Sequence, residues 1–125
     1  MRTVLVVPLL LMLTGCASAV TEKATPSHSR NLLSLEELEG SGLQTAFTAI
    51  QSLRPQWLRK RGPASVNVPM DIRVYLDSNR MGGPDFLRNI SVNDIASISY
   101  MNGMEATQRY GLDHGMGAII VVSKR

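Results

Sequence analysis

Residues 71–125 read DIRVYLDSNRMGGPDFLRNISVNDIASISYMNGMEATQRYGLDHGMGAIIVVSKR. This part contains three short apolar segments, Ile72–Leu76, Ile95–Met101 and Ala118–Val122, which polar connections separate. The first two alternate apolar and polar side chains, which indicates strands of a half-covered sheet. Ala118–Val122 is continuously apolar and predicts a strand that is buried on both faces. We expect these three strands to form a small mixed sheet.

Helical patterns surround the three segments. Ser34 followed by Glu37 fits a capping box and predicts a short helix over Leu35–Glu39. Pro55 ends a second helix near Leu53, and the apolar stripe of that helix consists of Leu43, Ala46, Phe47, Ile50 and Leu53. A short helical turn is expected over Asp85–Ile90, and Asn102 is placed to cap a helix over Gly103–Arg109. Residues 32–125 are therefore predicted to form one α+β domain, a small sheet packed with two to three short helices.

The connections between these elements are rich in turn residues. Asp77-Ser78-Asn79 is a turn by composition, and Met81-Gly82-Gly83-Pro84 is expected to be a loop. The Gly111–Gly117 loop is rich in glycine but lacks the Gly-Lys-Ser/Thr ending and the following helix of a phosphate-binding Walker loop.

The N-terminus has the features of an export signal. Arg2 precedes an apolar run, Val4–Leu13, which at about ten residues is half the length that a membrane-spanning helix requires. Leu13-Thr14-Gly15-Cys16 resembles the lipobox of bacterial lipoproteins, which implies cleavage after Gly15 and acylation of Cys16. The alternative is an ordinary signal peptide with an incidental cysteine. We expect residues 1–15 to be the signal and residues 16–31 to be a lipidated cysteine with a flexible, polar tether.

Composition narrows the class of protein further. Cys16 is the only cysteine, so a mature chain lipidated there has neither a disulfide nor a thiolate metal site. Without Arg2 the chain carries 12 basic and 10 acidic residues, a net charge near +2 that does not indicate nucleic-acid binding. The residue after the cysteine is Ala17, whereas an aspartate there is typical of lipoproteins retained in the inner membrane. The resemblance to lipoproteins therefore implies the outer membrane.

The most unusual local stretch runs from Arg54 to Pro63 and combines basic residues with the single tryptophan, Trp57. One interpretation is contact with phosphate or lipid headgroups, with Trp57 at the interface. The other is that Trp57 and Leu58 cap the core while the basic side chains face solvent, and we favour this second interpretation. Arg59 and Arg61 remain candidates for a contact surface in either case.

No arrangement typical of an active site is visible, so we do not expect an enzyme, a metal or a cofactor. A nucleophile needs a base and an orienting group. His114 is the nearest candidate base, but a histidine among glycines is expected to be exposed, and Asp113 beside it in sequence rarely completes such a unit. Asp77 with Arg80 or Arg109 is expected to be a structural pair or a turn rather than a site.

Several motifs recur in one known family. They are Val74-Tyr75-Leu76-Asp77, Val92-x-Asp94-Ile95-x-Ser97-Ile98, Ala106-Thr107-x-x-Tyr110-Gly111 and Gly117-Ala118-Ile119-Ile120-Val121-Val122-Ser123-Lys124. Together they resemble the plug domain of TonB-dependent outer-membrane receptors. The resemblance covers about Leu33 to Lys124 and implies a plug-like fold, whereas Ser78 stands where the family usually has glycine. Since those receptors continue into a barrel and this sequence ends at Arg125, transport is not implied.

These observations predict a lipid-anchored, plug-like interaction module of the outer membrane, without a transport barrel of its own. Its expected partners are the membrane, through Cys16, and an outer-membrane or envelope protein that adds a strand to an exposed sheet edge. The alternative is a small-ligand receptor or an enzyme that uses the Gly111–Gly117 loop. The candidate interaction residues are Trp57, Arg59, Arg61, Tyr75, Tyr110 and His114.

Overall fold

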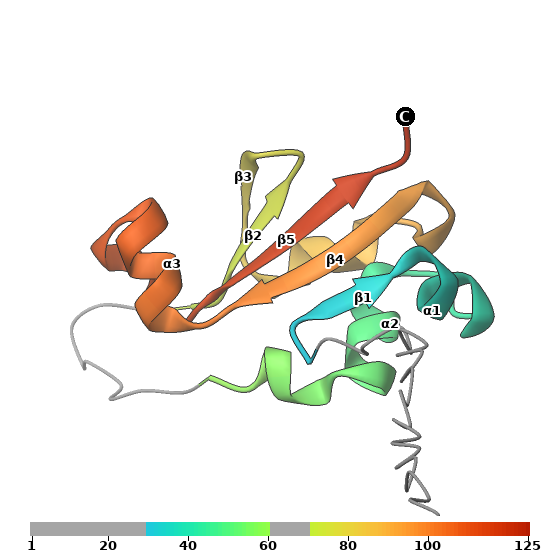
Figure 1. The fold of residues 1–125 in the computed structure, drawn as a ribbon, viewed down its shortest axis with the longest axis horizontal. Helices are drawn as coiled ribbons and strands as arrows, with labels where there is room; N and C mark the ends of the chain where they lie inside the picture. The colour runs from blue at the N-terminus through green and yellow to red at the C-terminus, as the bar shows by residue number, and fades with distance from the viewer. Residues whose placement is uncertain (1–29, 61–70) are drawn as a thin grey trace, which may run out of the picture.

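The computed structural model describes residues 30–60 and 71–125, and these form an α+β fold around one five-stranded mixed sheet (Figure 1). The strands are β1 (Leu32–Ser34), β2 (Arg73–Leu76), β3 (Asn79–Gly82), β4 (Ile95–Met101) and β5 (Ala118–Ser123). The α-helices are α1 (Leu35–Gly40), α2 (Ala46–Leu53) and α3 (Gly103–Tyr110). Short 3₁₀ helices occupy η1 (Pro55–Leu58), η2 (Pro84–Asn89), η3 (Val92–Asp94) and η4 (Leu112–His114).

The strands lie in the order β1-β4-β5-β2-β3. β2 and β5 are parallel, whereas the other three neighbouring pairs are antiparallel. The mixed sheet predicted from the sequence is therefore confirmed. The two edges of the sheet are β1, which begins just after the first described residue, and β3, on the far side of the sheet (Figure 1).

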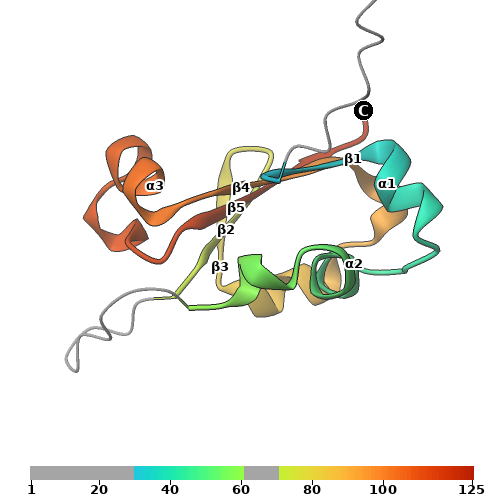
Figure 2. The ribbon, with the colours of Figure 1, turned by 60° about the horizontal axis from the view of Figure 1, so that its bottom comes forward.

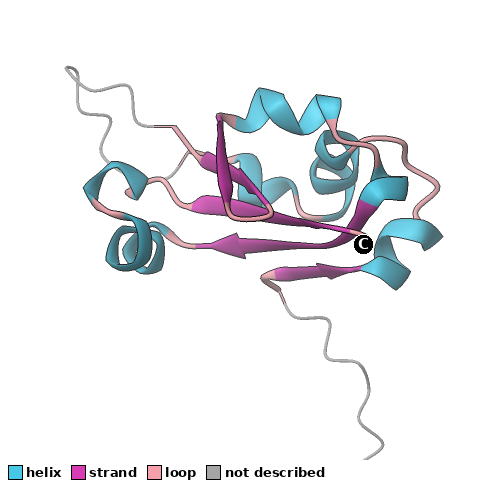
Figure 3. Ribbon diagram, turned by 90° about the horizontal axis from the view of Figure 1, so that it is seen from above, coloured by secondary structure: helices cyan, strands magenta, loops and turns pink. Residues whose placement is uncertain are grey.

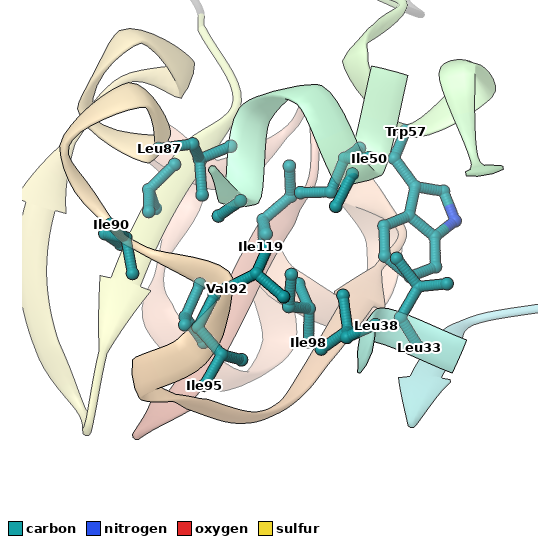
Figure 4. Close-up of a cluster of buried hydrophobic side chains, with 14 of the residues drawn as sticks. Leu33, Leu38, Ile50, Trp57, Leu87, Ile90, Val92, Ile95, Ile98 and Ile119 are labelled. Carbon is teal, nitrogen blue, oxygen red and sulfur yellow. The ribbon is translucent and has the colours of Figure 1, made fainter. Parts of the chain in front are cut away.

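One face of the sheet carries the main hydrophobic core (Figure 4). Helices α1 and α2 and the segments η1 and η2 cover this face, and Ile50 and Leu38 pack from the helices onto Ile98 and Ile119 of the strands. Trp57 is 1% exposed and belongs to the same core. The interpretation in which Trp57 caps the core is confirmed.

The opposite face is covered only in part by the described residues. Helix α3 packs over one end of it, on the side away from α2 (Figures 2 and 3). The side chains buried there form a second, smaller cluster that consists of Tyr75, Met101, Ala106 and Ala118. Continuous burial of β5 on both faces is confirmed for its first residues but not for Val122, which is 42% exposed.

The local signals at the helix ends are confirmed. The Ser34 side chain accepts a hydrogen bond from the backbone N–H of Glu37, and the Glu37 carboxylate accepts one from the N–H of Ser34. The Asn102 side chain accepts from the N–H of Glu105 at 2.9 Å and caps α3. Helix α2 ends at Leu53, directly before the residue that precedes Pro55.

Two strands and one register differ from the sequence-based expectation. The predicted turn at Asp77 exists, with positive φ at both Asp77 and Ser78, but it closes a two-residue hairpin. A two-residue turn of this type matches the twist of paired strands, so the residues after it pair with β2. The loop expected at Met81-Gly82 is therefore wrong, because these residues belong to strand β3. Strand β1 was not expected either, because three residues are too few to show a period. In β4 an irregularity after Ile95 turns this residue to the core face beside Ile98, which breaks the simple alternation.

Candidate functional site

Three of the candidate residues come together on the α3 side of the sheet. Tyr75 is contributed by β2, Tyr110 by the last turn of α3 and His114 by η4. The rings of Tyr75 and Tyr110 are stacked with centroids 4.5 Å apart, and the His114 ring lies 5.4 Å from Tyr110. The sequence named all three residues without predicting their contact, because 35 positions separate Tyr75 from Tyr110 and no local pattern links them.

A chain of polar contacts runs through this aromatic cluster to the surface. Tyr75 Oη lies 2.7 Å from His114 Nε2, His114 Nδ1 lies 2.6 Å from Asp113 Oδ1, and Asp113 Oδ2 accepts from Arg80 Nη2 at 2.6 Å. His114 Nδ1 also lies 3.1 Å from the Gly111 carbonyl oxygen, which is its hydrogen-bond partner. A carbonyl oxygen and a carboxylate only accept hydrogen bonds, so Nδ1 of His114 carries a proton. In the neutral ring Nε2 then accepts from the Tyr75 hydroxyl. We call Tyr75, His114, Asp113 and Arg80 the polar chain.

The electrostatics of the polar chain follow from burial and from Arg80. Burial raises the pKa of Tyr75 above its ordinary value of 10.0, and the positive charge of Arg80 opposes part of that rise. Desolvation also raises the pKa of Asp113, but the hydrogen bond from Arg80 and the charges of His114 and Arg80 outweigh it and hold this pKa below 3.8. Tyr75 is therefore held neutral and Asp113 ionised over the physiological range.

Glycines allow the loop to reach this position. Gly111 has φ +110, which ends α3 and lets η4 turn His114 toward the sheet. A Cβ atom on Gly103 would overlap the carbonyl group of Gly115, and one on Gly117 would lie 2.8 Å from the Met101 carbonyl oxygen. Two backbone segments therefore touch directly where β4 passes into α3.

The structure corrects the sequence-based view of His114. It is 1% exposed, although a histidine among glycines was expected to face solvent. Asp113 was not expected to form a unit with it, yet the 3₁₀ turn places the two neighbouring side chains against each other. Asp77 does not pair with Arg80: it accepts hydrogen bonds from the N–H and the hydroxyl of Ser123. The sequence also missed Arg80 and Asp113 as partners, although recognising the two-residue hairpin would have placed Arg80 opposite Tyr75.

The basic stretch around Trp57 does not present the tryptophan to a partner. Its ring is buried, stacks on Tyr100 with centroids 5.7 Å apart, and donates its indole N–H to the Arg30 carbonyl oxygen at 3.2 Å. Trp57 is therefore wrong as a surface contact residue, because it fixes the start of the domain to the core. Arg59 is exposed, as expected. Arg61 and Cys16 lie outside the described residues.

One of the two edge strands of the sheet is β3. Leu76 and Asn79 close the hairpin, so the N–H and C=O of Arg80, the next residue, point away from β2. The side chains of Asn79, Arg80 and Met81 are all exposed. Among residues 30–60 and 71–125 no strand pairs with this outer edge. The geometry therefore offers backbone hydrogen-bonding groups to an incoming strand.

Metal chemistry finds no support in the described part of the chain, where no group of three His, Cys, Asp or Glu side chains is placed to hold an ion. Both ring nitrogens of His114 already have hydrogen-bond partners within the fold, the Tyr75 hydroxyl at Nε2 and the Gly111 carbonyl oxygen at Nδ1. The polar chain ties η4 to the edge hairpin of β2 and β3.

No protein-family model matches the chain, and neither a curated protein nor a solved structure matches it. Within residues 30–60 and 71–125, none of the helices has the length and apolar character that crossing a membrane requires.

Proposed function

We propose that this protein is a lipid-anchored interaction module of the bacterial outer membrane, with a plug-like domain. The lipobox at Leu13-Thr14-Gly15-Cys16 supports the anchor. The five-stranded mixed sheet with short helices is the class of fold that the resemblance to receptor plug domains implies. The expected partner is an outer-membrane or envelope protein.

The observation that carries the proposal is the outer edge of β3. An extended segment of a partner protein extends the sheet there, and its backbone pairs with the outward N–H and C=O of Arg80. The edge is only four residues long and has an irregular register between Val74 and Tyr75 of its neighbour, features that suppress indiscriminate pairing. Recognition therefore needs side-chain contacts as well, for which the exposed Met81 is available.

The polar chain prepares this edge for binding. Arg80 is held by Asp113, which in turn contacts the buried His114, so the hairpin is fixed to η4 at its exposed side. A fixed edge loses less conformational entropy on binding than a free hairpin does. In this proposal Tyr75, Tyr110 and His114 pack behind the binding edge, hold it in position and do not touch the partner.

Photo-crosslinking in cells tests the proposal. A crosslinking amino acid replaces Met81 on β3 in one variant and Gln51 on α2 in the matched control, and both positions are exposed. We expect a specific adduct with one envelope protein from position 81, none from position 51, and loss of the adduct in Cys16→Ser. Equal adducts from both positions, or none from a correctly localised protein, would contradict strand addition at β3.

The second candidate is a small-ligand receptor or an enzyme that uses the Gly111–Gly117 loop. The Tyr75–His114–Asp113 contacts favour it, because they bring a hydroxyl, an imidazole and a carboxylate together, although the hydrogen bond of His114 Nδ1 goes to the Gly111 carbonyl oxygen. Tyr75 and His114 are only 6% and 1% exposed, however, so a substrate does not reach the hydroxyl or the ring without displacing the aromatic cluster. The interaction module is therefore the better-supported function.

A further inference from the structure

The edge of the sheet at β1 has an alternating set of outward backbone groups. The Tyr100 N–H of β4 donates to the Asn31 carbonyl oxygen at 2.8 Å, so Asn31 points inward, toward β4. Residues of an antiparallel strand alternate between inward and outward hydrogen bonding. The outward backbone groups of this edge therefore belong to Arg30, Leu32 and Ser34.

A side chain occupies an outward group at each end of this edge. The carbonyl oxygen of Arg30 accepts from the indole N–H of Trp57 at 3.2 Å, and the N–H of Ser34 donates to Glu37 Oε2 at 3.2 Å. The Ser34 carbonyl oxygen is taken by the first turn of α1, because Ser34 is the N-cap of this helix. Between these two ends, the outward N–H and C=O of Leu32 have no partner among residues 30–60 and 71–125.

Other contacts hold both of these side chains in place. Trp57 is 1% exposed and lies beside Leu33 and Leu38 in the main core (Figure 4). Glu37 forms an ion pair with Arg54 at 3.0 Å, and both of these side chains are 14% exposed. The two groups are therefore already fixed against the edge before another chain approaches it. We call Trp57 and Glu37 the edge caps.

An added strand pairs with the outward groups of every second residue along an edge. On β1 the edge caps leave Leu32 between two occupied positions, whereas on β3 none of the described side chains bonds to the outward groups of Arg80. An open β1 would favour pairing between copies, because Leu32 and Leu35 are 39% and 37% exposed beside it. We propose that the edge caps close β1 to strand addition. In a part that rests on the proposed function, this closure also directs the partner strand to β3.

Self-association of the full mature chain tests the closure without any partner protein. The background is Cys16→Ser, which leaves the chain without a cysteine. Glu37→Ala removes the acceptor of the Ser34 N–H and should about double the weight-average mass in sedimentation equilibrium at high concentration. Glu37→Gln keeps an accepting oxygen and should stay monomeric. The matched control is Ser34→Ala, which removes the other half of the capping box and leaves the carboxylate in place, so it should stay monomeric too.

A disulfide identifies the edge through which the copies associate. Two copies that pair antiparallel through the outward groups of Leu32 place their Leu32 Cα atoms about 5.5 Å apart, within the range of a disulfide. Leu32→Cys should therefore give an oxidised dimer when combined with Glu37→Ala and stay monomeric when combined with Ser34→Ala. Gln51→Cys, at an exposed position of α2, should give no such dimer in either combination.

Amide hydrogen exchange tests the cap in a chain whose edge is not substituted, so it does not depend on the folding of a variant. The N–H of Ser34 is bonded to the Glu37 carboxylate, whereas the N–H of Leu32 points outward without a described partner. The Ser34 amide should therefore exchange about tenfold or more slowly than the Leu32 amide. Equal protection of the two amides would mean that Glu37 does not cap the edge.

The outcomes separate the closure from the proposed function. A folded Glu37→Ala that stays monomeric overturns the closure, and so does equal association of Ser34→Ala or Glu37→Gln, because loosening of α1 is then sufficient. In cells, a crosslinking amino acid at Leu32 should give no adduct while Glu37 is intact, and an adduct there would also contradict the closure. Association of Glu37→Ala without any adduct from position 81 would leave the closure intact and refute the proposed function.

Discussion

The two faces of the sheet are held by different kinds of contact. The α2 side is a continuous apolar core in which Leu38, Ile50, Trp57 and Ile119 are 0–1% exposed. The α3 side has a small cluster in which the stacked rings of Tyr75, Tyr110 and His114 lie at the buried end of the polar chain, while Arg80 lies at its exposed end. Apolar contacts depend on area and tolerate variation, whereas a buried polar contact depends on both partners and on their geometry. Apolar burial on the α2 side therefore supplies most of the stability of the fold, whereas specific polar contacts on the α3 side set the position of η4 and the hairpin.

The largest expected effect lies on the α2 side. Trp57→Ala should lower the free energy of unfolding by about 3–5 kcal/mol, because a fully buried aromatic ring is removed from the core. Urea unfolding followed by circular dichroism measures it. Arg59→Ala, two positions further in the same basic stretch but exposed, should change the same quantity by less than about 0.5 kcal/mol. Similar effects for the two variants would mean that Trp57 is not a core residue.

Next in size is the backbone contact beneath α3. Gly103→Ala should cost about 1–3 kcal/mol, because the new methyl group overlaps the Gly115 carbonyl and the loop must move. The control is Gly40→Ala at the end of α1, where no atom lies within 4 Å of the added Cβ. The control should be neutral or slightly stabilising, since alanine reduces the entropy of the unfolded chain. Equal thermal midpoints for the two variants would contradict the close approach.

The buried hydrogen bond on the α3 side should have a smaller effect. Tyr75→Phe leaves Nε2 of His114 without its partner and should cost about 1–2 kcal/mol. Tyr110→Phe removes a hydroxyl from the same cluster without touching that bond, and should cost less. The pKa of Tyr75 is raised on folding, so its contribution is complete below pH 10.0 and is lost as the pH rises through the folded value. Tyr75→Phe should therefore flatten the alkaline limb of the stability profile.

The smallest expected effect concerns the exposed end of the polar chain. The pKa of Asp113 is lower in the folded protein than its ordinary value of 3.8. Its contribution is therefore present above that value and is lost as the pH falls through the folded pKa. Asp113→Asn should reduce the loss of stability between neutral and strongly acidic pH, measured by unfolding at a series of pH values. Asp85→Asn, at an exposed residue of η2, serves as the control and should leave the acid limb nearly as steep.

Features that depend on residues close in sequence were predicted correctly, whereas features that depend on distant residues were often missed. The capping box at Ser34, the end of α2 before Pro55 and the cap at Asn102 were predicted because each signal and its effect lie within a few residues. The hairpin strand β3 was missed because Ser78, unlike glycine, is a weak signal for a turn with positive φ. Burial of Trp57 was the favoured of two interpretations, whereas burial of His114 was not expected.

By itself, the sequence determined the α+β class, most of the helix boundaries and the three central strands, because apolar periodicity and capping are local properties of the chain. Only the tertiary structure decided that Tyr75, Tyr110 and His114 form one cluster and that Arg80 reaches Asp113. It also decided which apolar side chains remain exposed on the α3 side. The physical reason is that strand order and register bring residues from distant positions together, and pairing across a sheet leaves no period in the sequence.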